Sequence, residues 1–213
     1  TVSGNLSAFD LVLAADWSSR WLSGEFRDVT VSDWQRWPTL AGLNGQIQLQ
    51  VGQGNLRLSA PVLQVDWPEM FAYPFQLSLP ECQAELQLGS QWQIVLQSCH
   101  LFNDDLSAQG DVLIAASPGR PAVDINVEVL RLDAASLNPY WPEGVMPATV
   151  TDWLRTNLLA GQLSGGRLQV HGDMDDWPFS NGVGRFEAWA AFENGSLSFA
   201  PGWPELKQVD ITA

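Results

Sequence analysis

The chain has 213 residues, 46% of them hydrophobic, so it is long and apolar enough to bury a sizeable core. Its 24 aspartates and glutamates against 10 lysines and arginines give a net charge of −14, which argues against nucleic acid as a partner and against a surface that lies on anionic lipid headgroups. No apolar run approaches the roughly 20 residues of a membrane-spanning helix, and no signal peptide is recognisable.

Alternation of apolar and polar residues predicts roughly ten short strands in the first 130 residues. The first two are expected at residues 9–15 and 25–32. Asn44-Gly45 and the segment 52–55 have the composition of tight turns, which favours hairpins between neighbouring strands. Short turns of this kind make an antiparallel meander the simplest topology.

The strand at 123–129 shows the alternation most clearly, because Asp124, Asn126 and Glu128 separate its four β-branched side chains. Such a pattern turns one side of a sheet away from water and the other side toward it. The candidate site residues are the side chains expected on the apolar side: Ile47, Leu49, Val51, Leu56, Leu58, Leu63, Val65, Leu77, Leu86, Leu88, Trp92, Ile94, Leu96, Val112, Ile114, Val123, Ile125, Val127, Val129, Leu168 and Val170.

A helical period replaces the strand period in one stretch, which predicts a short amphipathic helix near 147–160. Pro147 suits the first turn of that helix, and Gly161 suits a left-handed cap at its end. The apolar face of the predicted helix is formed by Val150, Trp153, Leu154 and Leu158.

We therefore expect one elongated β domain over residues 1–213. It would consist of an antiparallel meander at 1–140, a helix insertion at 141–161 and returning strands at 162–213. Because the chain starts without Met inside alternating sequence, we also expect it to be a fragment of a longer protein.

The returning strands repeat an earlier module, since segment 26–40 aligns with segment 192–206 without a gap. Recurrence of one strand-and-turn module is typical of extended repeat architectures. The matching pairs, all at an offset of 166, are Phe26 with Phe192, Val31 with Leu197, Ser32 with Ser198, Trp37 with Trp203, Pro38 with Pro204 and Leu40 with Leu206.

The two cysteines, Cys82 and Cys99, flank a turn at residues 89–91. A regular ladder from that turn sets Cys82 opposite Ser98 and leaves Cys99 on the other side of the sheet. The apolar residues of the second strand step by three positions just before Cys99, which indicates a β-bulge. With a bulge the two sulfur atoms face one another, so a disulfide and a pair of buried thiols both remain open.

Tryptophan occurs 11 times, and five of these residues precede a proline. Exposed indoles serve as stacking platforms for sugars or as anchors at a lipid interface. The residue before proline is confined to extended backbone, which favours a structural interpretation in which each pair ends a strand and closes the open end of the sheet. The five residues are Trp37, Trp67, Trp141, Trp177 and Trp203.

Residues that could carry chemistry are few. His100 and His171 have no second histidine or cysteine at a metal-ligand spacing, which indicates surface histidines. Asp173, Asp175 and Asp176 form an acidic cluster without the spacing of an EF-hand, which indicates a solvated turn. No nucleophile motif or phosphate-binding glycine loop occurs. We expect no catalytic residue, no metal site and no cofactor.

A series of short motifs resembles the YhdP branch of the AsmA-like envelope proteins. The motifs DWL, LLAG, HGDMDDWPF, GRFEAWAAFENGSL and PGWPEL carry the resemblance, and SGEFRDVTVSDWQRWPTLAGLNGQIQL and APVLQVDWPEMF extend it over most of the chain. It implies a bridge-like lipid transfer protein, anchored in the inner membrane, that crosses the Gram-negative periplasm and carries phospholipid toward the outer membrane. Periplasmic residence would favour a bond between the two cysteines.

The expected sheet is long. Ten strands at about 4.8 Å spacing extend for about 50 Å, roughly three times the half-thickness of a bilayer core. We expect a twisted antiparallel sheet curled into an open, taco-like groove, apolar within and acidic without, that shields acyl chains as a conduit. Two alternatives remain: a closed, tryptophan-rich β-sandwich that binds glycan, and an AsmA/TamB-like scaffold that assembles outer-membrane proteins by edge pairing.

Overall fold

The computed structural model describes residues 1–13, 20–32, 37–200 and 202–212. Its strands are β1 (Val2–Leu13), β2 (Arg20–Val31), β3 (Thr39–Gln50), β4 (Gln53–Asp66), β5 (Phe75–Gln87), β6 (Gln93–Phe102), β7 (Leu106–Ala115), β8 (Ala122–Leu132), β9 (Leu158–Asp173), β10 (Arg185–Leu197) and β11 (Leu206–Thr212). The helical elements are the single turns η1 (Ala134–Ser136), η2 (Asn138–Tyr140) and η3 (Met174–Asp176) and the α-helix α1 (Ala148–Asn157).

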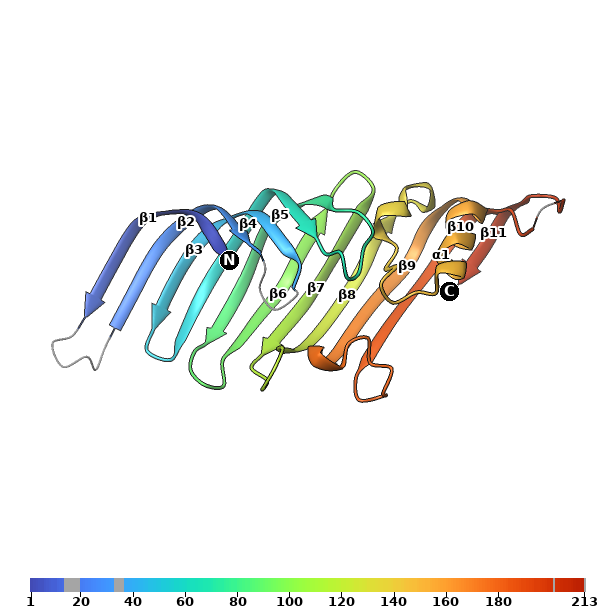
Figure 1. The fold of residues 1–213 in the computed structure, drawn as a ribbon. Helices are drawn as coiled ribbons and strands as arrows, with labels where there is room; N and C mark the ends of the chain where they lie inside the picture. The colour runs from blue at the N-terminus through green and yellow to red at the C-terminus, as the bar shows by residue number, and fades with distance from the viewer. Residues whose placement is uncertain (14–19, 33–36, 201, 213) are drawn as a thin grey trace.

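All the strands belong to one antiparallel sheet in which spatial order follows sequence order from β1 to β11 (Figure 1). The sheet does not close, because β1 and β11 stand at its two ends. The predictions of a mainly β protein, of a long open antiparallel sheet and of one short helix are confirmed. At about 4.8 Å per strand the sheet is about 50 Å long.

In the described part of the chain eight strands precede α1, fewer than the roughly ten that the alternation predicts. The difference arises because β4 and β5 each contain two of the expected strands. Register shifts between β4 and β5, at Leu58/Ala60 and at Ala60/Leu63, interrupt the alternation without ending either strand. Asn44-Gly45, expected as a turn, lies within β3, and residues 14 and 15 of the first expected strand lie outside the described residues.

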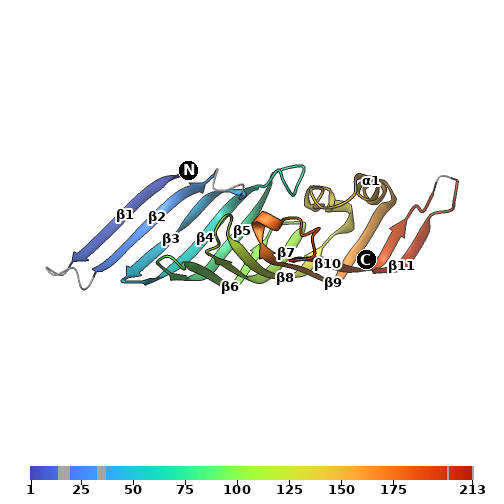
Figure 2. The same cartoon turned by 60° about the horizontal axis from the view of Figure 1, so that its bottom comes forward.

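Residues with positive φ interrupt several strands of the sheet. One extra residue at a bulge bends a strand and increases its twist, so bulges in successive strands bend the whole sheet. Figures 1 and 2 show the resulting curvature of the strands. The residues with positive φ in the strands include Ala8, Asp28, Gly42, Ser98, Gly161, Asn194 and Gln208.

The two segments that match in sequence also share their backbone geometry. Asp28 and Asn194, which are aligned, have φ angles of 53° and 55°. Gly42 and Gln208, at the same offset, have positive φ as well. The hairpins β2–β3 and β10–β11 have the same register. In β2–β3, Phe26 pairs with Gly45, Val29 with Leu43 and Val31 with Leu40. The equivalent pairs of β10–β11 are Phe192 with Ile211, Gly195 with Val209 and Leu197 with Leu206.

The helix α1 lies within the expected range, starting after Pro147 and ending at Asn157. Gly161 does not cap it: the chain becomes extended at Leu158, and Gly161 lies inside β9. The side chain of α1 that is buried is Thr151, whereas Val150 and Trp153 are exposed. Of the other two residues of the predicted apolar face, Leu154 is half-buried and Leu158, the first residue of β9, is buried.

Candidate functional site

The apolar side chains of neighbouring strands stand opposite one another and so share one face of the sheet. Directly paired residues of antiparallel strands point to the same side. One row crosses eight strands, from β3 to β10, without a polar residue, and it consists of Ile47, Leu56, Ala84, Leu96, Val112, Ile125, Val170 and Phe186. We call this side of the sheet the apolar face.

The structure places all but three of the candidate site residues in strands, at positions on the apolar face. Val51, Leu88 and Trp92 instead lie at the β3–β4 and β5–β6 connections, outside the strands. Val51 and Leu88 are exposed there, because the pairing that would extend the face ends before them.

Several residues of the apolar face were not among the sequence-based candidates. Their period-two spacing was visible, but small residues such as Ala84 and Ala188 carry little hydrophobic signal, and bulges shift Leu101 and Leu79 out of step. The residues that pairing adds to the face are Leu22, Phe26, Leu79, Ala84, Leu101, Ala108, Phe186, Ala188 and Ala190.

The opposite face of the sheet is polar. Asp111, Asn126, Gln169 and Glu187 form one row on it, in register across β7 to β10. Side chains bond along such rows: Gln169 Nε2 donates to Asn126 Oδ1 at 2.8 Å. The sheet is therefore amphipathic over most of its length, as the alternation predicts.

Burial of the apolar face is uneven. Where the strands bend, a cluster of buried side chains packs beneath β4 to β6, with Ala60, Leu63 and Leu79 at its centre. A second cluster lies where η1 and η2 cover β8 to β10, around Leu137 and Phe192. Between the bend and the lower turns, row members such as Ile47, Leu56 and Val112 are only half-buried. Among the described residues, no second layer of strands lies over this half-buried strip.

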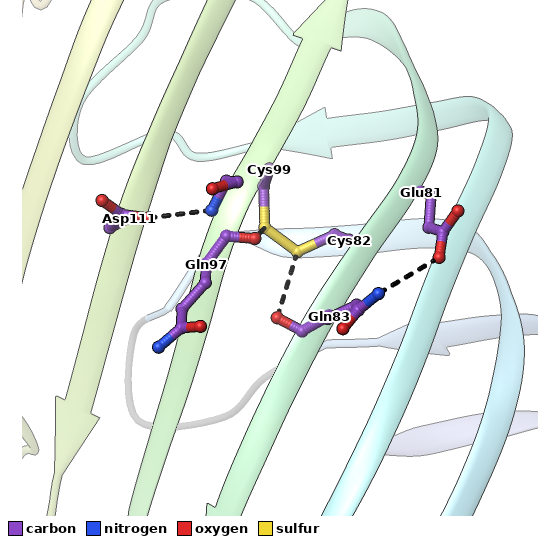
Figure 3. Close-up of a disulfide and its surroundings, with 7 residues drawn as sticks. Glu81, Cys82, Gln83, Gln97, Cys99 and Asp111 are labelled. Atoms are coloured by element: carbon purple, nitrogen blue, oxygen red, sulfur yellow. Dashed lines mark hydrogen bonds between the residues drawn. A yellow bond between two sulfur atoms is a disulfide. The ribbon is translucent and has the colours of Figure 1, made fainter.

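A disulfide joins Cys82 of β5 to Cys99 of β6 on the apolar face (Figure 3). The pairing of Gln83 with Gln97 would set Cys82 opposite Ser98 in a regular ladder. Ser98 instead adopts a φ of 51°, and its N–H donates to Asp111 Oδ1 at 2.8 Å. This bulge turns Cys99 toward Cys82, so of the two alternatives the structure contains the disulfide.

The polar residues with possible chemistry have structural partners. His100 lies 2.9 Å from the Ser107 hydroxyl, and His171 is a surface residue beside Asp124. Asp173 accepts hydrogen bonds from the Ser117 hydroxyl and from the backbone N–H of Asp175, and these bonds, the first above all, lower the pKa of its carboxyl. Asp173 thereby caps η3. Within the described residues, no group of three or more His, Cys, Asp or Glu side chains is arranged to hold a metal ion.

No helix in the described part of the chain is both long and apolar enough to cross a membrane.

Comparison with known proteins gives a match to a family model and to a curated relative. None of the solved structures gives a significant match. A curated relative, the intermembrane phospholipid transporter YhdP of Escherichia coli strain K12, is 21% identical over 209 residues, and the match covers 97% of this chain. It covers 16% of that relative, so the chain spans about a sixth of the relative's length. The model of the YhdP protein family matches residues 2–213. The chain therefore belongs to the YhdP family.

Proposed function

We propose that this chain is one segment of a conduit that carries phospholipid between the inner and outer membranes, with acyl chains lying along the apolar face. The observation that supports the proposal is the uninterrupted apolar row from Ile47 on β3 to Phe186 on β10, backed by a polar face. The transport activity named for the relative gives the same class of cargo.

The apolar face of a sheet that forms a single layer has to be covered by something other than a second sheet. Exposed apolar surface costs about 25 cal/mol per Å², and a contiguous exposed strip in a soluble protein marks a place where something binds. Acyl chains would cover the half-buried strip without specific hydrogen bonds, since its side chains offer none. The polar face, with carboxylates such as Asp111 and Glu187, would remain in water.

The dimensions favour a conduit over a pocket. The strip extends along a sheet of about 50 Å, whereas one acyl chain spans roughly half of a 30 Å bilayer core. One lipid therefore would fill only a fraction of the strip, and several lipids would follow one another along it. No catalytic step is part of this function.

The proposed location is the periplasm, as part of a protein anchored in the inner membrane by regions outside this chain. The Cys82–Cys99 disulfide supports an oxidising compartment of this kind. A closed β-sandwich that binds glycan is less well supported, because the strands form one open sheet.

The proposal can be tested by site-specific photo-crosslinking in the full-length protein in cells. A photoreactive residue at Ile47, on the apolar face, should form adducts with phospholipid acyl chains, and the same residue at Gln48, on the polar face, should not. Val112 and Leu113 give a second pair in which both residues are apolar and only the face differs. Equal labelling of both faces, or no acyl adduct at Ile47 and Val112, would contradict the proposal.

A further inference from the structure

Two connections from opposite ends of the strands meet across the apolar face. Trp67 follows β4 at the upper end of the sheet in Figure 1, and Trp177 follows η3 at the lower end of β9. Their rings are stacked, with centroids 6.4 Å apart and an interplanar angle of 27°. The strands lie oblique to the long axis of the sheet, so the upper end of β4 and the lower end of β9 come together when the sheet curls. Figure 2 shows the β9–β10 connection in front of the middle strands.

A charged contact crosses the face at the same place. Arg120, in the β7–β8 connection at the lower end, has its Nη2 atom 4.0 Å from Glu69 Oε2, in the β4–β5 connection at the upper end. Arg120 Nη1 also donates to the Met174 carbonyl at 3.0 Å, which ties it to η3. The Arg120 side chain is 12% exposed, so this contact is more shielded from water than an ordinary surface ion pair.

These connections rest directly on the sheet. Met174 and Phe179 are buried against Val123 of β8 and Val170 of β9, each 6% exposed or less. Trp67, Trp177 and also Trp37 pack against the same cluster. These side chains pack directly on the strands, so no space is left for an acyl chain between them at this point. The half-buried strip on either side is not covered in this way.

We propose that these residues form a clasp, consisting of Trp67, Glu69, Arg120, Met174, Trp177 and Phe179, which closes the conduit in this conformation and opens to let acyl chains pass. The inference rests on the proposed function, because a gate has meaning only where lipid moves along the apolar face. It divides the face into a section on β2 to β6 and a section toward β11, and lipid crosses between them only when the clasp is open.

The clasp can open without unfolding the sheet. Side chains of connections make its contacts, and connections open at a smaller free-energy cost than paired strands. The indole Nε1 of Trp67 is buried and has no hydrogen-bond acceptor among the described residues. A buried donor without an acceptor disfavours the closed state. Opening would expose this N–H to water or to the ester oxygens of a lipid.

The clasp can be locked by chemical crosslinking in the purified full-length protein. Cysteines at Glu69 and Arg120 (E69C/R120C) would be joined by a bismaleimide with a spacer just long enough for the closed clasp, or by one with a much longer spacer. Transfer of fluorescent phospholipid between vesicles should stop with the short spacer and continue with the long one. Equal transfer with both spacers, or equal loss with both, would overturn the inference.

A matched control lies on the polar face. Arg57 and Glu81 form an ion pair at 3.5 Å between β4 and β5, and both side chains are exposed. The short crosslink between cysteines at these positions (R57C/E81C) should leave transfer unchanged, because it joins strands that already pair. Loss of transfer in this control would show that crosslinking itself disrupts the protein, and the inference would lose its support.

A second measurement tests the opening of the clasp independently of lipid transfer. Spin labels on the same two cysteines at positions 69 and 120 should give one short distance without lipid and a second, longer distance when vesicles of phosphatidylethanolamine and phosphatidylglycerol are added. A single short distance under both conditions would overturn the clasp even if lipid is transferred. A lengthening without any transfer would instead contradict the proposed function and leave the opening itself established.

Discussion

Cys82 on β5 and Cys99 on β6 are joined through their sulfur atoms, with their Cα atoms 4.7 Å apart. The bond lies at the bend of the sheet, within the cluster that includes Ala60 and Leu79. It therefore fixes the relative position of two neighbouring strands at the point where the bulge at Ser98 breaks their regular pairing.

Replacing both cysteines by alanine should destabilise the chain by about 3 kcal/mol, the loop-closure entropy expected for a sequence separation of 17 residues. Urea unfolding of the wild-type chain and the variant measures this difference. Reductant should lower the stability of the wild-type chain by a similar amount and leave the variant unchanged. A reductant effect of the same size in both chains would show that it acts elsewhere.

Two glycines with similar backbone conformation test the packing at the bend. Gly42 in β3 has a φ of 89°, and a Cβ atom there would lie 2.3 Å from the Val62 carbonyl oxygen. Gly52, in the β3–β4 turn, has a φ of 78° and no atom within 4 Å of such a Cβ. Alanine at Gly52 should cost about 1 to 2 kcal/mol through its left-handed conformation alone.

Alanine at Gly42 should cost about 1 to 3 kcal/mol more than alanine at Gly52, because the added methyl group forces β3 and β4 apart. Chemical unfolding of both variants gives the comparison. Equal losses would mean that β3 and β4 do not approach as closely at the bend as the structure shows.

The sequence predicts the composition of the two faces well, because neighbouring residues of a regular strand lie on opposite faces of the sheet. This is why Ile125 and Val170 were placed on the apolar face without knowledge of their neighbours. Alternation also explains the main error. Register shifts between β4 and β5 interrupt the alternation, so the sequence predicts two strands in place of each, and the positions of the shifts depend on how β4 pairs with β5.

Other features depend on contacts that no local pattern contains. Asn44-Gly45 has the composition of a turn, yet it lies within β3. A Cβ at Gly45 would be 2.0 Å from the Arg57 carbonyl oxygen, so the glycine serves the close approach of β3 to β4 and not a turn. The stacking of Trp67 on Trp177 depends on the obliqueness of the strands and on the curl of the sheet. The prediction that each Trp-Pro pair ends a strand holds for Trp67, which follows β4, but Trp141 and Trp177 follow η2 and η3. No local pattern shows which indoles meet.

Acid should weaken the attachment of η3. The Ser117 hydroxyl and then the Asp175 N–H hold the pKa of the Asp173 carboxyl below its ordinary value of 3.8. A lowered pKa in the folded state means that ionised Asp173 stabilises the chain above pH 3.8, and that this stabilisation is lost as the pH falls through the lowered pKa.

The variant Asp173→Asn should therefore be less stable than the wild-type chain at pH 7, and the difference should shrink as the pH falls below 3.8. Thermal unfolding at several pH values measures it. Ser117→Ala, which removes the main donor, should show the same trend. A difference that stays constant with pH would contradict this account of Asp173.

Leu56 offers a test of the apolar face away from the clasp. It is the second member of the row, between Ile47 of β3 and Ala84 of β5, and it is half-buried. Leu56→Val removes one methylene group, whose burial contributes at most about 0.8 kcal/mol of hydrophobic free energy. This variant should leave the amount of bound lipid unchanged. Leu56→Asp places a carboxylate where acyl chains would lie, and a charge in hydrocarbon is strongly unfavourable.

Native mass spectrometry of the full-length protein purified in mild detergent measures the lipid bound to each variant. We expect the amount of copurified phospholipid to fall for Leu56→Asp and to remain at the wild-type level for Leu56→Val. Arg57→Asp adds the same carboxylate one residue away on the polar face, so it should also keep the wild-type level. If Arg57→Asp and Leu56→Asp lose lipid equally, the effect belongs to the overall charge, and the apolar face is not where the lipid lies.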